Sequence, residues 1–317
     1  MKLGRLRRRS GGVIDRRGAG PAGGGGGLEG LPGFPTGGRG GGLPIPGGSR
    51  GGIGIGGILL VLVLLFVLPR CLGSGGSLIP NPGAVEGFPD IGSGGGGATE
   101  VDPTDPTGQF VDAVQDDIQV TWQEEFQRAG KTYQPTRVVL FRGSTRTGCG
   151  LGTAQTGPFY CPLDQRVYLD ASFFRELERR FGAPGDFAQA YVIAHEIGHH
   201  VQTVLGISRQ VTQASQQDPS RQNELSIRQE LQADCLAGVW ARSADTRGVL
   251  DQGDLEEGIG AAAAVGDDRI QASVNGRIEP ESWTHGSAEQ RTRWFQRGFE
   301  TGNPDACDTF SVPADQL

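Results

Sequence analysis

The stretch His195-Glu-Ile-Gly-His199 brings two histidines and a glutamate close together in the sequence. Side chains four positions apart lie on the same face of a helix, so both imidazoles can reach one Zn²⁺ ion. Glu196 lies beside that face, where a carboxylate can take a proton from a water molecule that zinc activates. The spacing therefore predicts a catalytic zinc site. The alternative is a pair of hydrogen-bonded histidines on a surface helix without a metal.

A third ligand is expected, because catalytic zinc sites use three protein ligands and keep one position open. Glu230 and Asp234 stand four positions apart, so their carboxylates share one helical face. We assign Glu230 to the metal and Asp234 to the ring N–H of a ligand histidine, a contact that such sites commonly need. The alternative, a solvated acidic helix face, conflicts with the apolar neighbours Leu231, Ala233, Cys235, Leu236, Ala237 and Gly238.

Two further histidines complete the set of four. His200 points about 100° away from His199 on a helix, so we expect it to pack or to form hydrogen bonds rather than to share the metal. His285 precedes a helix in a polar turn and is a candidate donor to the oxyanion that forms when a peptide carbonyl is attacked. Tyr160 is a rival for that role, and an ordinary surface-loop histidine is the alternative for His285.

The two histidines followed by Glu230-x-x-Ala-Asp234 resemble the gluzincin pattern, in which a second helix supplies the third ligand. More closely, residues 110–312 resemble the bacterial neutral zinc metallopeptidase family. The matching stretches are Thr156-Gly-Pro-Phe-Tyr-Cys-Pro162, His195-Glu-Ile-Gly-His-His-Val-Gln202, Glu230-Leu-Gln-Ala-Asp-Cys-Leu-Ala-Gly238 and Thr284-His-Gly-Ser-Ala-Glu-Gln290. The resemblance implies a zincin-like, minimal gluzincin domain that binds Zn²⁺. Members of this family also tend to carry a basic tail and one transmembrane helix.

Apolar residues at helical spacing predict most of the elements that must position these side chains. The predicted helices cover residues 108–129, 173–181, 186–205, 223–241 and 254–265, and a further helix begins at the capping box Ser287-Ala-Glu-Gln290. Short β-type runs occupy 137–141 and 166–170, whereas 148–162 contains too many glycines for regular structure. The fold class is therefore α+β, mostly helical, with a small β-sheet.

Residues 1–50 differ in composition from the rest of the chain. They contain 19 glycines and nine Lys/Arg against two acidic residues, so their net charge is +7 and the remaining residues carry −14. Without sustained apolar periodicity they bury too little surface to offset the entropy of folding. We expect a disordered basic tail over 1–50 and a flexible linker over 70–109, with the peptidase domain over 110–312.

The run from 51 to 69 contains no charged residue, and its centre, 58–68, is continuously apolar. As a helix it spans about 28 Å at roughly 1.5 Å per residue, close to the hydrocarbon thickness of a membrane. We expect a signal anchor, with the basic N-terminus cytoplasmic and the C-terminal domain extracytoplasmic. The alternatives are a buried core helix, a cleaved signal peptide, and a lipid-modified Cys71. Pro69 and Arg70 stand where a lipidation site needs small residues.

Cysteine usage is compatible with export, because the domain contains an even number of cysteines. Four cysteines allow three pairings. We favour Cys149–Cys161, which closes a glycine-rich loop, and Cys235–Cys307, which ties the C-terminal region to a central helix. Four reduced, buried thiols are the alternative.

These features together predict a membrane-anchored zinc endopeptidase that acts on a protein or peptide substrate, with Glu196 as the general base. An extended substrate is expected to pair with the strand at 166–170 or with Tyr160-Cys161 just before it. The alternative is an inactive, metal-stabilised binding or scaffold domain, although such a domain has no need of Glu196. Nucleic-acid binding is not expected, because the basic tail contains a single aromatic residue, Phe34.

Overall fold

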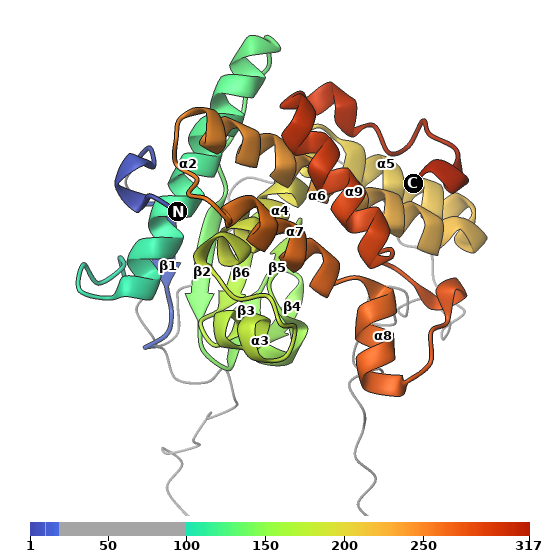
Figure 1. Ribbon diagram of the computed structural model, residues 1–317, viewed down its shortest axis with the longest axis horizontal. Helices are drawn as coiled ribbons and strands as arrows, with labels where there is room; N and C mark the ends of the chain where they lie inside the picture. Colours follow the sequence, from blue (N-terminus) through green and yellow to red (C-terminus); the bar gives the residue numbers. More distant parts are fainter. Residues whose placement is uncertain (10, 19–98) are drawn as a thin grey trace, which may run out of the picture.

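The computed structural model describes residues 1–9, 11–18 and 99–317. Its helices pack together beside a small sheet (Figure 1). The helices are α2 (Pro106–Arg128), α3 (Phe173–Arg179), α4 (Asp186–Val204), α5 (Ile207–Gln217), α6 (Gln222–Thr246), α7 (Asp254–Ala264), α8 (Asp267–Asn275) and α9 (Ala288–Thr301). The predicted fold class, mostly helical α+β with a small sheet, is confirmed.

The main sheet has the order β1-β2-β6-β5. Its strands are β1 (Val13–Asp15), β2 (Arg137–Phe141), β6 (Arg166–Asp170) and β5 (Phe159–Cys161). The first three are parallel, and β5 runs antiparallel to β6. Val138 and Leu140 of β2 pack into the large helical core, whereas Val139 and Phe141 pack into a smaller cluster on the other face. A strand covered on both faces is apolar throughout, as the sequence of β2 is.

The glycine-rich segment 148–162 is more regular than the sequence suggested. It contains β4 (Gly150–Thr153), which pairs antiparallel with β3 (Ser144–Thr147), and β5 at the edge of the main sheet. The disulfide Cys149–Cys161 closes this segment with an S–S distance of 2.03 Å. Pairing with neighbouring strands and the disulfide supply the order that the local composition does not.

Helices α6 and α9 lie side by side over much of their length (Figure 1). Glycines at 238 and 298 permit this contact, because a Cβ at either position would collide with the backbone of the facing helix. A second disulfide, Cys235–Cys307, joins α6 to the C-terminal region with an S–S distance of 2.04 Å. Both disulfide pairings agree with the expectation from the sequence.

Two helices, α5 and α8, were not predicted. No residue of α5 is fully buried, and α8 is a nine-residue helix without a buried apolar face. In α5, Ile207, Val211 and Ala214 do recur at helical spacing, and this short, partly buried apolar stripe was missed. The apolar residues of α8 are too few to form such a stripe. The helix α6 also continues to Thr246, five residues beyond its predicted end.

The N-terminal residues differ from the expected disordered tail. Residues 1–9 and 11–18 pack on the domain, and β1 pairs in register with β2. Arg7 donates from its backbone N–H and its guanidinium to Asp117 of α2, which is fully buried. Glycine predominates only after residue 18, so the composition of 1–50 as a whole conceals an N-terminal segment whose arginines meet buried carboxylates.

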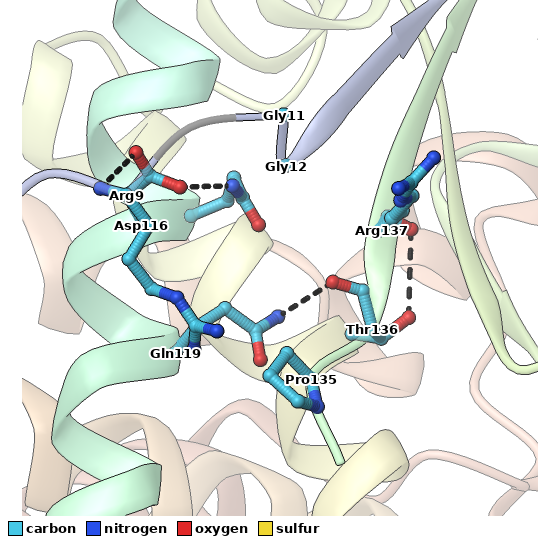
Figure 2. A pocket seen from close by; sticks show the side chains of 9 residues that line it. Arg9, Gly11, Gly12, Asp116, Gln119, Pro135, Thr136 and Arg137 are labelled. Atoms are coloured by element: carbon cyan, nitrogen blue, oxygen red, sulfur yellow. Dashed lines mark hydrogen bonds between the residues drawn. The ribbon is translucent and has the colours of Figure 1, made fainter.

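A hollow of about 220 Å³ lies between this segment, α2 and the start of β2 (Figure 2). Within it the backbone N–H of Arg9 donates to Asp116, and Gln119 donates to the carbonyl of Thr136. None of the predicted site residues lines this hollow. The contact of Arg9 with Asp116 holds the N-terminal segment against the domain.

Among the described residues, no helix combines the length and the apolar character needed to cross a membrane. The predicted anchor at 51–69, the remainder of the tail at 19–50 and most of the predicted linker lie outside the described residues. The end of that linker belongs to the fold, since Thr99 pairs with Asp15 and Asp105 caps α2.

Candidate metal centre

The predicted ligands come from two helices in close contact. Helix α4 contributes His195 and His199, and α6 contributes Glu230. Gly198 permits the approach, because a Cβ at this position would lie 3.1 Å from the backbone oxygen of Ala233 on α6. The ligand atoms of the two histidines and Glu230 all lie within 4.8 Å of one another.

Both imidazoles present Nε2 to the same carboxylate. Glu230 Oε2 lies 3.2 Å from His195 Nε2, and Glu230 Oε1 lies 3.5 Å from His199 Nε2. Ligand atoms at about 2.0–2.1 Å from a tetrahedral zinc are separated by roughly 3.3–3.4 Å. Two nitrogens and one carboxylate at these separations fit Zn²⁺ with one position left open.

His195 is oriented through its second nitrogen. Nδ1 lies 2.8 Å from Asp234 Oδ1, so Nδ1–H donates to the carboxylate and Nε2 keeps its lone pair for the metal. Asp234 is fully buried and also accepts from Tyr191 and, at 2.8 and 2.9 Å, from Arg291. The contact predicted for Asp234 is present. Arg291, in contrast, was not singled out, since it reaches the site from α9.

His199 has a different partner. Its Nδ1 lies 2.9 Å from Oε1 of Gln202, which is also fully buried. Gln202 follows His199 by three residues, a spacing that places the two side chains together on a helix. The spacing of three residues was the only signal in the sequence for this contact. It is a weak signal, because a glutamine in a helix can form hydrogen bonds with many other partners.

The charges around the site favour a bound cation. Burial acts to lower the pKa of His195, yet the Asp234 carboxylate, together with Glu230, raises it to about 10. Burial acts to raise the pKa of Glu230, but His199 and His195 hold it well below its usual range. Buried carboxylates need a counter-charge, and a proton on His195 supplies one when no metal is bound.

Glu196 lies next to the ligands and is 8% exposed. Burial raises the pKa of its carboxyl, and the neighbouring His195 and His199 oppose this shift. Its side chain makes no hydrogen bond within the part of the chain that the structure describes. A poorly solvated, unpaired carboxylate beside a metal has the properties of a proton acceptor.

The turn that carries His285 lies against α6, the helix of Glu230, because Ser226 of α6 donates to the carbonyl of Thr284 at 2.9 Å. Burial acts to lower the pKa of His285, whereas Asp267 and Glu230 raise it above the usual value. Asp267 Oδ1 lies 3.1 Å from His285 Nδ1, and Oδ2 accepts the backbone N–H groups of Thr284 and His285, each at 2.7 Å. Asp267 thus fixes both the ring and its turn.

His200 lies away from the metal ligands, as its position on the helix predicted. It is 1% exposed, and its Nε2 donates to the carbonyl oxygen of Gln134 at 2.7 Å. The hydroxyl of Tyr160 lies 3.1 Å from His200 Nδ1. Tyr160 is therefore already engaged, which leaves His285 as the better candidate for the oxyanion donor.

Known proteins resemble this chain over most of its length. Residues 2–310 match the model of a family described as "Putative neutral zinc metallopeptidase". The "Uncharacterized protein YpfJ" of Escherichia coli (strain K12) is 51% identical over 207 residues, which cover 65% of this chain and 72% of that protein. The "Uncharacterized protein Mb2605" of Mycobacterium bovis is 48% identical over 191 residues, covering 57% and 64%. No solved structure gives a significant match.

The family match begins at residue 2, so it includes the N-terminal segment that packs on the domain. It also includes the three candidate ligands, Glu196 and His285. Zinc is the cofactor that this family implies. With its two-histidine, one-carboxylate centre and a match that extends over nearly all its residues, this chain belongs to the neutral zinc metallopeptidase family.

Proposed function

We propose that this protein is a zinc-dependent endopeptidase whose general base is Glu196. The observation that supports this most directly is the meeting of His195, His199 and Glu230 within 4.8 Å, beside a buried carboxylate that has no other partner among the described residues. A metal that only stabilises a fold is usually closed by four protein ligands. Here three ligands leave a position open next to a base.

The roles of the residues follow from their contacts. When bound, zinc supplies Lewis acidity, which polarises a peptide carbonyl and makes water acidic enough to ionise near neutral pH. Glu196 accepts the proton of the attacking water and can return it to the leaving amine. Asp234 keeps His195 in the tautomer that binds through Nε2. His285, held by Asp267, donates to the oxyanion.

A peptide substrate is proposed to bind along β5. The strand β6 is paired with β2 along its whole length and with β5 over residues 166–168, so most of 166–170 has no free edge for another strand. That part of the expectation from the sequence is therefore wrong. The strand β5 forms the edge of the described sheet and contacts α4, so an added strand there would run next to the metal ligands.

The proposal is tested on the purified full-length chain, because residues 1–18 belong to the fold. We expect about one zinc per chain and zinc-dependent cleavage of an unfolded protein. Glu196→Gln keeps the shape of the side chain but loses the base, so it should retain zinc while turnover falls by about 10²–10⁴. Equal turnover by the variant would exclude Glu196 as the base. Stoichiometric zinc without any turnover by the wild type would favour the scaffold alternative.

We propose in addition that residues 51–69 attach the protein to the cell membrane. Their nineteen uncharged residues support this, and the disulfides favour an extracytoplasmic domain. The positive charge ahead of 51–69 favours a cytoplasmic N-terminus. The contacts of residues 1–18 with the domain instead favour a placement of these residues on the same side of the membrane as the domain.

A further inference from the structure

The orientation of Gln202 is determined by its other hydrogen bonds. Its Nε2 donates to the backbone carbonyl of Gln229 at 2.7 Å and to Oε1 of Gln232 at 3.0 Å. A backbone carbonyl can only accept, so Oε1 of Gln202 must face His199. Because this carboxamide oxygen can only accept, Nδ1 of His199 must carry the proton that it donates. The other ring nitrogen, Nε2, is then free to bind the metal.

The same chain of amides continues to a disulfide. Oε1 of Gln232 accepts from Gln202, and its Nε2 donates to the backbone carbonyl of Cys307 at 3.0 Å. Cys307 is 1% exposed and is bonded to Cys235, three residues after Gln232 on α6. Three hydrogen bonds therefore connect the carbonyl of Cys307 to the imidazole of His199. The two bonds of Gln232 are buried, and the bond to His199 is partly buried.

We propose that Gln202 positions His199 for zinc, and that Gln232 and the disulfide Cys235–Cys307 hold Gln202 in place. The disulfide then contributes to zinc affinity although it lies outside the metal site. This inference rests on the proposed ligand role of His199. The other disulfide, Cys149–Cys161, takes no part in these hydrogen bonds and provides an internal control.

The test is the zinc dissociation constant of the full-length chain, measured by competition with a chelator. Gln202→Met keeps the volume of the side chain and removes its hydrogen bonds, so zinc affinity should fall by about 10–100-fold. Gln232→Met leaves the disulfide intact and should weaken zinc in the same direction. Gln119→Met is the matched control, because Gln119 is a buried glutamine that bonds Thr136 and Tyr133 instead.

The disulfides are compared as pairs of serine substitutions. Loss of Cys235–Cys307 should weaken zinc binding, whereas loss of Cys149–Cys161 should leave it within about twofold of wild type. Circular dichroism of the zinc-free proteins identifies variants that do not fold, and the absorption of bound Co²⁺ reports ligand geometry independently of turnover. Wild-type affinity in both methionine variants would overturn the positioning role. Equal effects of the two disulfides would overturn the coupling. Failure of the wild type to bind zinc would instead refute the proposed metal site.

A separate observation concerns the N-terminal segment. Three contacts join the N-terminal segment to residues that follow the apolar run. The strand β1 pairs with β2, and Arg7 forms a hydrogen bond with the buried Asp117. Asp15 and Thr99 exchange backbone hydrogen bonds at 3.0 and 3.1 Å. Separation would expose a strand edge and remove a counter-charge from Asp117. A single membrane crossing between residues 18 and 99 would require that separation.

We infer that residues 1–18 and 99–317 lie on the same side of the membrane. The inference is tested by labelling single cysteines in cells with a membrane-impermeant maleimide, in a Cys71→Ser background. Arg8→Cys reports the N-terminal segment and Glu289→Cys reports the domain, since their side chains are 48% and 86% exposed. Both should be labelled or both protected in intact cells.

Labelling of only one site in intact cells, and of both after permeabilisation, would overturn this inference and support a cytoplasmic N-terminus. A second measurement uses the pair Asp15→Cys and Thr99→Cys. Opposed residues that exchange both hydrogen bonds have Cα atoms about 5.5 Å apart, within the range of a disulfide. Formation of this disulfide in membranes would support the shared side, and its absence under oxidising conditions that form the native disulfides would contradict it.

Discussion

Replacement of His285 by alanine should separate catalysis from metal binding. The ring hydrogen-bonds through Nδ1 to Asp267 and makes no hydrogen bond to His195, His199 or Glu230. The three ligands therefore keep their partners in the variant. Removal of one oxyanion donor costs about 10²–10³ in kcat in a well-studied protease. We expect a loss of about two orders of magnitude in kcat with an unchanged zinc content.

The cost to stability should be small by comparison. Asp267 Oδ2 still accepts the backbone N–H groups of Thr284 and Gly286 in the variant, so the turn remains held. The loss of the hydrogen bond of the ring should lower the free energy of unfolding by about 1 kcal/mol. A much larger loss would mean that His285 is needed for the fold, and the drop in kcat would then carry no information about the oxyanion.

The pH dependence gives an independent check. Burial acts to lower the pKa of His285, but the hydrogen bond to Asp267 raises it, so the charged donor persists above the usual pKa of a histidine. In the wild type kcat should fall as pH rises through this raised pKa, and His285→Ala should lack that alkaline limb. The assay is kcat at saturating unfolded protein substrate between pH 6 and 9, with zinc content measured on each sample. Turnover of the variant within a few-fold of wild type would refute the role, and Tyr160→Phe would be examined next.

Two further predictions concern the ligands and the N-terminal contacts. Glu230→Ala should lose most of its zinc by elemental analysis; full retention would exclude Glu230 as the third ligand. Asp117→Asn should lower the free energy of unfolding by about 3 kcal/mol in urea titrations, because it removes the buried carboxylate charge that pairs with Arg7 and Arg247. Burial acts to raise the pKa of Asp117, but Arg247 and Arg7 hold it below its usual value. Its stabilising share is thus present above about pH 4 and lost at lower pH, so wild type and variant should converge in acid; parallel pH profiles would contradict this.

The sequence alone was sufficient for features that local geometry determines. Residues four apart on a helix must share a face, so His195 and His199 could be assigned to one metal without any tertiary information. The same reasoning paired Glu230 with Asp234. The capping box at Ser287 likewise marked the start of α9, since its two hydrogen bonds lie within three residues.

Only the tertiary structure decided which distant residues support the site. Gln202 could be placed beside His199 from its spacing, but its orientation depends on Gln232 and the carbonyl of Cys307. Arg291 and Asp267 reach the site from α9 and α8, and no local pattern links them to α4. The partners of a buried polar group are fixed by the packing of whole helices.

The N-terminal segment shows the same limit most clearly. Its arginines and glycines are typical of a disordered tail. Composition does not show which acidic residues of the fold lie close to these arginines. The buried Asp117 on α2 and the free edge of β2 give residues 1–18 a place in the fold. Both partners are more than one hundred residues away in the chain. Local spacing in the sequence thus predicted the candidate metal ligands, whereas contacts between distant segments determined which residues hold those ligands and the N-terminal segment in position.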